Sequence, residues 1–148
     1  MTELHDPKVR EAIKSRVRGL RPDARGKWGA MTVDQMLWHL GSALELCLGR
    51  SDAGEESLPF PMPQPMLRFA VLNLPWPQGV PTLNALKATG SHDFQAEQSR
   101  CLQLIDEFTA KPLRDRWPVH PVLGNMTGSQ YSRLQAKHFL HHLAQFGA

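Results

Sequence analysis

Three features of the sequence predict an all-α protein and, more narrowly, an up-down-down-up four-helix bundle. Four segments carry apolar residues three or four positions apart, which is the spacing of one helix face. No segment alternates apolar and polar residues as a half-buried strand does. A proline-rich connection, residues 50–90, separates the second helical segment from the third and is long enough to cross the length of a bundle.

The first helix is predicted over residues 6–19. Asp6 can cap its start, and Pro7 fits the first helical position, where a missing amide hydrogen costs nothing. Its apolar residues form one stripe at spacings of four, four and three: Val9, Ile13, Val17 and Leu20. This stripe is the face that we expect to pack on the rest of the bundle.

The other three helices are predicted at residues 32–48, 91–111 and 127–146, with Ser91 or Asp93 opening the third. The second and the fourth begin with the same pattern, G-x-M-T-x-x-Q. Its Thr-x-x-Gln part is a capping box, in which threonine and glutamine satisfy each other's free amide hydrogens. The shared glycine and methionine are either coincidental or the mark of a pseudo-symmetric bundle built from two helical hairpins.

The connection over residues 50–90 holds seven of the twelve prolines. Proline lacks the amide hydrogen and breaks helices. One short apolar piece, residues 66–74, is expected to form a helical turn or two. If the second and third helices run parallel, their connection must return along the whole bundle, which gives this long stretch a structural use.

Length and composition indicate one domain over residues 1–148. Apolar residues make up 41% of the chain and charged residues 21%, which is typical of a soluble globular protein. No apolar run approaches the roughly 18 residues that cross a bilayer, and the polar N-terminus does not resemble a signal peptide. We therefore expect a cytoplasmic protein with no membrane partner, in which Cys47 and Cys101 are buried, reduced thiols.

The net charge is +3, and much of the excess lies in residues 8–27, where eight Lys/Arg face two Asp/Glu. Such a segment can bind nucleic acid. No nucleic-acid motif or interleaved aromatic platform accompanies it, so a solvated helix face explains it better. Nucleic acid is not expected as a partner.

Three histidines on predicted helices form a candidate site for one divalent metal ion. His138 and His142 lie four residues apart, so their rings converge on one face of the fourth helix. That pair alone is weak evidence. His39 strengthens it because it points toward the core, where an imidazole without partners is costly. The alternative to a metal ligand is that His39 is a structural core histidine bonded to a backbone carbonyl.

Register supports the same set of ligands. His39 lies early in its helix and His138 late in its own, so the two meet only if these helices are antiparallel, as the long crossover requires. Three imidazoles leave coordination positions open, as in a catalytic site, and they suit Zn, Ni, Cu, Fe or Co. His141 is three residues from His138, so it either replaces His142 or stands outside the ligands.

Three segments, residues 28–39, 120–124 and 138–147, resemble the DinB/YfiT-like superfamily of metalloenzymes. More narrowly, the ending H-x-x-H-H-L-x-Q-F-G resembles an uncharacterised branch of it. The resemblance implies an up-down-down-up bundle, often a homodimer, with zinc or nickel as the usual metal. Its metal triad falls on His39, His138 and His142. Some relatives are transferases or isomerases that use low-molecular-weight thiols, but the chain lacks the extra domain of the mycothiol-dependent isomerases.

The expected function is that of a metal-dependent thiol transferase or hydrolase, in which the metal activates a water or a thiol. Gln35 lies one turn before His39 and is expected to hydrogen-bond to a ligand or substrate. His120 is expected to carry a proton, or else to be an ordinary loop histidine. The alternative function is a non-catalytic, dimeric metal-binding or stress-response module, because no other acid or base is evident.

Overall fold

Helices account for the regular structure of residues 2–51, 56, 62–80 and 82–148, which are the residues that the computed structural model describes. The helices are α1 (Pro7–Arg18), α2 (Val33–Cys47), α3 (Gln64–Asn73), the short 3-10 helix η1 (Asn84–Leu86), α4 (Phe94–Ala110) and α5 (Gly128–Gln145). The described residues contain no strand, only one isolated bridge between His120 and Gly124. The prediction of an all-α protein is therefore confirmed for this part of the chain.

The four predicted helices begin and end within three residues of their expected limits, because their caps form as the sequence indicates. Asp6 accepts the amide hydrogen of Lys8 at 2.8 Å. Asp93 accepts that of Ala96 at 2.8 Å, which makes Asp93 rather than Ser91 the cap of α4. Capping boxes open α2 and α5.

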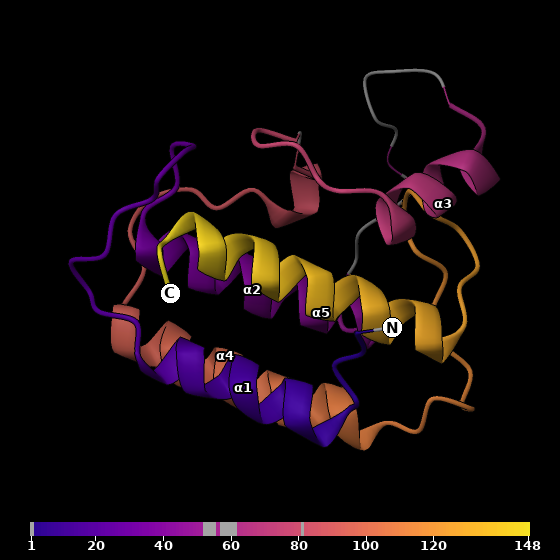
Figure 1. Cartoon of the computed structure of the whole chain (residues 1–148), viewed down its shortest axis with the longest axis horizontal. Coiled ribbons are helices and arrows are strands. Elements are labelled where there is room, and N and C mark those ends of the chain that lie inside the picture. The colour runs from indigo at the N-terminus through magenta and orange to yellow at the C-terminus, as the bar shows by residue number, and fades with distance from the viewer. Residues whose placement is uncertain (1, 52–55, 57–61, 81) are drawn as a thin grey trace.

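Hydrogen bonds at both ends of α2 define its direction relative to its neighbours. Gln145, at the end of α5, donates to the carbonyl oxygen of Trp28, just before α2, at 2.8 Å. Gln135, early in α5, donates to Sγ of Cys47, at the end of α2, at 3.1 Å. Helices α2 and α5 are therefore antiparallel, and Figure 1 shows them side by side.

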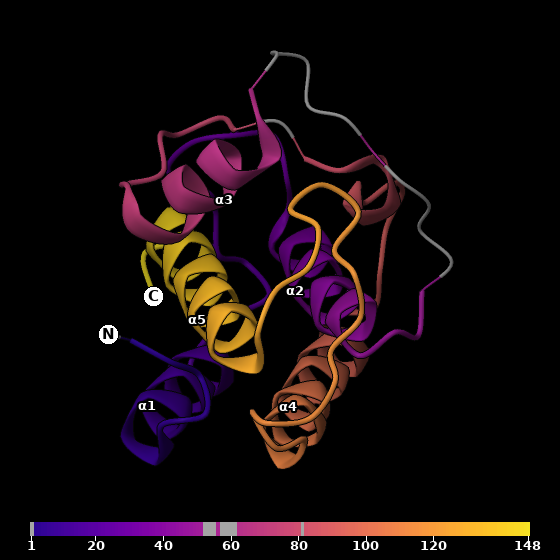
Figure 2. The same cartoon turned by 90° about the vertical axis from the view of Figure 1, so that its right-hand side faces the viewer.

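Helices α2 and α4 run in the same direction. The amide of His92, just before α4, donates to Asp34 near the start of α2 at 2.8 Å. Arg50 and Glu107 form an ion pair at 3.3 Å near the other ends of the two helices. Figure 2 shows α1, α2, α4 and α5 around a common interior, with α3 over α5. The largest fully buried side chains fill that interior: Leu4, Ile13, Val17, Met36, Leu37, Leu40, Leu44, Ile105, Phe108, Tyr131, Phe139 and Leu143.

Helix α3 is longer than the helical turn or two expected for residues 66–74. It is 10 residues long and has a proline in its first turn, where proline is tolerated. Gln64 donates to the carbonyl oxygen of Val122 at 3.0 Å, and Arg68 to that of Leu123 at 2.9 Å. Helix α3 is thereby attached to the loop before α5.

Both cysteines are buried and free, as predicted. Burial raises the pKa of the Cys47 thiol and of the Cys101 thiol to about 12. Neither is a reactive thiolate near neutral pH. In the part of the chain that the structure describes, no helix combines the length and the apolar character needed to span a bilayer.

Candidate metal centre

His39, His138 and His142 come together in the interior between α2 and α5. One ring nitrogen of each lies within 4.8 Å of the corresponding nitrogens of the other two. The side chains are almost removed from solvent, with 4%, 9% and 9% of their surfaces exposed. His39 is near the middle of α2, and the antiparallel course of α5 brings the later histidines level with it.

A backbone carbonyl from the crossover fixes the orientation of His39. Nδ1 of His39 donates to the carbonyl oxygen of Leu86, in η1, at 2.8 Å. A carbonyl oxygen only accepts hydrogen bonds, so Nδ1 must carry the hydrogen. The lone pair of neutral His39 is therefore on Nε2, which is the atom that faces the other histidines.

A glutamine one turn further along α5 fixes His142 in the same way. Nδ1 of His142 lies 2.7 Å from Oε1 of Gln145. The amide of Gln145 donates through Nε2 to the carbonyl oxygen of Trp28, so its oxygen faces His142 as an acceptor. His142 therefore carries its hydrogen on Nδ1 and has a lone pair on Nε2. Such outer partners are typical of metal-binding histidines.

The spacing of two of the nitrogens, those of His39 and His138, suits a shared cation. Nε2 of His39 and Nε2 of His138 are 2.8 Å apart. Two nitrogens bound to one ion at about 2.0–2.1 Å, at a right angle, are separated by roughly 2.9 Å. The three rings stand at 72° to 80° to one another, with centroids 4.7–4.8 Å apart. Without a cation, the same short contact requires His138 to donate to His39.

Burial keeps the three imidazoles neutral. It is the main cause that lowers the pKa of His39 and lowers the pKa of His142 to about 3. Burial, followed by the neighbouring His39 and His142, holds the pKa of His138 well below its usual value. Metal ions bind the neutral form of histidine, so this donor set fits a divalent ion.

His141 lies outside the cluster, which resolves the alternative left open by the sequence. Its ring packs against Trp28, at 5.6 Å between centroids, and against Trp76, at 5.5 Å. The ring of Trp76 also contacts His138, at 5.9 Å. Trp76 comes from the crossover and covers one side of the centre.

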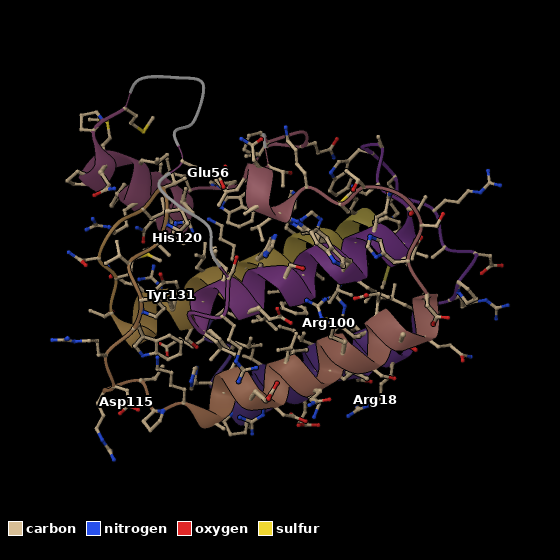
Figure 3. The ribbon with its side chains drawn as sticks, turned by 180° about the vertical axis from the view of Figure 1, so that it is seen from behind. Arg18, Glu56, Arg100, Asp115, His120 and Tyr131 are labelled. Carbon is tan, nitrogen blue, oxygen red and sulfur yellow. The ribbon has the colours of Figure 1, made fainter. Side chains whose placement is uncertain are left out.

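His120 is half-buried in the loop before α5 and is not one of the three clustered histidines. Its Nδ1 accepts the amide hydrogens of Val122 and Leu123, both at 3.1 Å, so the neutral ring carries its hydrogen on Nε2. Burial lowers the pKa of His120 to about 4, although the carboxylate of Glu56 opposes the shift. Figure 3 shows His120 between Glu56 and Tyr131.

Gln35 lies at the start of α2, and both ends of its amide are bonded to backbone. Oε1 accepts the amide hydrogen of Thr32 at 3.0 Å, and Nε2 donates to the carbonyl oxygen of Gly90 at 2.8 Å. The side chain thus ties the start of α2 to the segment before α4.

Two contributors to the centre were not predicted from the sequence: the amide of Gln145 and the ring of Trp76. A backbone carbonyl bonded to His39 was expected only as the alternative to metal binding, without its residue, and the structure shows that it is Leu86. A signal existed for Gln145, which lies three residues after His142 and so on the same face of the helix. A backbone carbonyl such as that of Leu86 leaves no signature in a sequence.

A family model described as a protein of unknown function, DUF1569, matches residues 25–148. The chain belongs to the DUF1569 family. The matched range holds α2 to α5, and therefore the whole histidine cluster of this DUF1569 protein, whereas α1 precedes it. No curated protein and no solved structure matches the chain.

Proposed function

We propose that this chain is a metal-dependent enzyme, a thiol transferase or a hydrolase, built on one divalent ion held by His39, His138 and His142. The observation that carries the proposal is the common orientation of His39 and His142. Each has a hydrogen-bond acceptor at Nδ1 and so keeps a lone pair on Nε2, and one ring nitrogen of each lies within 4.8 Å of those of the other two histidines in the cluster. Zinc and nickel are the metals that we expect, because the resemblance to the DinB/YfiT-like superfamily implies them and neutral imidazoles suit both.

A divalent ion bound by three neutral imidazoles supplies Lewis-acid chemistry, since it lowers the pKa of a water or a thiol beside it and provides a nucleophile near neutral pH. The chain's own part is to hold and to enclose the centre. Leu86 and Gln145 keep two of the rings turned toward the ion. Trp76 limits access of bulk water from the side of His138.

We further propose that the chain is a single domain over residues 1–148 with the up-down-down-up bundle of the DinB/YfiT-like superfamily. The antiparallel course of α2 and α5 and the parallel course of α2 and α4 support this. A thiol substrate is favoured by the same resemblance.

His120 remains our candidate for proton transfer. Its hydrogen bonds restrict which of its ring nitrogens can take part. Nδ1 is occupied by two backbone amides, so neutral His120 acts as a donor through Nε2. We expect it to stabilise negative charge that develops on a substrate. Gln35 can contact a substrate only by giving up its bond to Gly90, so its role in catalysis stays a prediction.

An activity screen tests the proposal. The metal-free protein and protein loaded with zinc or nickel are assayed with a panel of low-molecular-weight thiols and electrophilic acceptors, and with ester and amide substrates. We expect activity that chelation removes and that the metal restores. Activity that is equal in the metal-free protein would contradict the metal mechanism.

The alternative, a non-catalytic dimeric metal-binding module, is favoured by one observation. Met66 and Phe69 on α3 are 57% and 62% exposed, and exposed apolar side chains on one helix are typical of contact surfaces. Sedimentation velocity distinguishes the two readings when it is combined with the activity screen. A dimer that binds metal but turns over no substrate would support the module.

A further inference from the structure

A groove between α3 and α5, beside the histidine centre, is basic on one wall and apolar on the other. Its volume is about 570 Å³, which lies in the range of small-molecule sites. Arg133, Lys137 and His141 line it from α5, whereas Leu74 and Pro75 line it from the segment that follows α3. No residue of the histidine cluster lines it.

The basic wall follows from spacing along α5. Arg133, Lys137 and His141 are four residues apart and so form one stripe on the helix. His138 and His142 each come one residue after a member of that stripe and form a neighbouring stripe. One helix therefore presents its metal-binding side to α2 and its basic side to the groove.

The positive charges of this groove lack carboxylate partners. Arg133 donates to Oδ1 of Asn73 at 3.0 Å, and Lys137 donates to the carbonyl oxygen of Val71 at 2.7 Å and to that of Leu74. All of these acceptors are neutral. Neither cation takes part in an ion pair among the residues that the structure describes. Two like charges one helical turn apart attract an anion.

We propose that the groove binds the anionic group, a carboxylate or a phosphate, of a small organic substrate, with Arg133 and Lys137 as its anchors. The inference rests on the proposed function, because it assigns a substrate class to that centre. Arginine binds both kinds of anion through paired hydrogen bonds. The apolar side chains of the groove, Leu74 and Pro75 after α3 and Leu140 on α5, cover the carbon part of the same molecule.

Trp76 connects the groove to the histidine centre. It lines the groove, and its ring contacts His138 and His141 at 5.9 and 5.5 Å between centroids. Lys137 and His141 lie one turn apart, about 6 Å along the helix. A substrate anchored at Lys137 therefore needs to extend by only a few bonds to reach the tryptophan that covers the metal ligands.

Calorimetric titration of the metal-free protein tests this inference without the metal. The probes are acetate, benzoate and inorganic phosphate, each up to about 10 mM at low salt. We expect benzoate to bind more tightly than acetate, because the apolar wall adds to the ionic contact. If phosphate binds more tightly than benzoate, the natural anion is a phosphate. No binding of benzoate and of phosphate by the wild-type chain would overturn the inference.

Matched variants assign the binding to this groove. Arg133→Gln and Lys137→Gln are expected to weaken the probe that binds by about tenfold each. Arg18→Gln removes the same charge from the exposed end of α1, far from α3, and is expected to leave affinity within about twofold. Equal affinity in the wild type and in both groove variants would contradict the assignment.

Two further measurements keep the result interpretable. Arg133→Lys retains the charge but not the paired hydrogen bonds, so it is expected to recover only part of the affinity that Arg133→Gln loses. A purely structural role for Arg133 at Asn73 would not predict that recovery. Thermal unfolding checks that each variant is folded. If the probes bind but the protein holds no metal, the proposed function fails and the anion site stands. If metal is held but no probe binds, only the groove inference fails.

Discussion

Gln145 accepts a hydrogen bond from Nδ1 of His142 at 2.7 Å and so determines which nitrogen of His142 faces His39 and His138. The same amide donates to the carbonyl oxygen of Trp28, which prevents it from rotating. One glutamine thereby joins the end of α5, the start of α2 and a metal-ligand candidate. We therefore expect the loss of this glutamine to weaken metal binding.

Gln145→Leu is expected to weaken zinc binding by about tenfold to hundredfold, as is usual when the outer partner of a histidine ligand is lost. Competition with a chromophoric chelator measures the affinity. Gln145→Glu keeps an acceptor for His142 and should retain most of the binding. Gln103→Leu, on the exposed side of α4, is the matched control. Equal losses for the leucine and glutamate variants at position 145 would contradict the orienting role.

The pH dependence of the free energy of unfolding should contain a contribution from His120. Its folded-state pKa is about 4, against an ordinary value of roughly 6.5 in the unfolded chain. Between these values the unfolded chain binds more protons, so the free energy of unfolding falls as the pH drops from 6.5 toward 4. Protonation of His120 changes the free energy of unfolding by up to about 1.4 kcal/mol for each pH unit between these two values.

His120→Gln removes this contribution, and a glutamine oxygen can still accept from Val122 and Leu123. Urea unfolding of metal-free protein between pH 4.5 and 7 should therefore show a shallower slope in His120→Gln than in the wild type. The remaining slope comes from the other buried histidines, whose folded-state pKa values are also lowered. Identical slopes in the two proteins would mean that His120 is not held neutral by the fold.

Gly128, the first residue of α5, is expected to tolerate no side chain. A Cβ there would lie 2.5 Å from Nε1 of Trp117 and closer still to the carbonyl oxygen of Leu113, which is backbone and cannot rotate away. Gly128→Ala should cost about 1–3 kcal/mol and lower the Tm by several degrees. At Gly19 the nearest atom would be 3.5 Å away, so Gly19→Ala should be nearly neutral. Similar Tm values for the two variants would refute the packing argument.

The sequence predicts the fold well where local chemistry determines structure. Helix limits follow from caps such as Asp6 and Thr127, whose hydrogen bonds depend on only a few neighbouring residues. The structure of the crossover is harder to predict, because its backbone lacks a repeating pattern. Helix α3 was underestimated for this reason, although the proline in its first turn is a usable start signal.

The candidate site was predictable in part. The four-residue spacing of His138 and His142 places both on one face of a helix, and the direction of α5 places that face toward His39. The choice between His141 and His142 could not be made from spacing, since it depends on how α5 is rotated about its axis. Packing decides that rotation: His141 lies against Trp28 and Trp76, which come from elsewhere in the chain.

The central claim is that three histidines hold one metal ion, and elemental analysis of protein purified without an affinity tag tests it most directly. We expect about one zinc or nickel ion per chain. His39→Ala should lose the metal, because it removes one of the three converging nitrogens. His141→Ala removes a neighbouring imidazole outside the cluster and should keep the metal. Unchanged metal content in His39→Ala, or a loss confined to His141→Ala, would contradict the proposed centre.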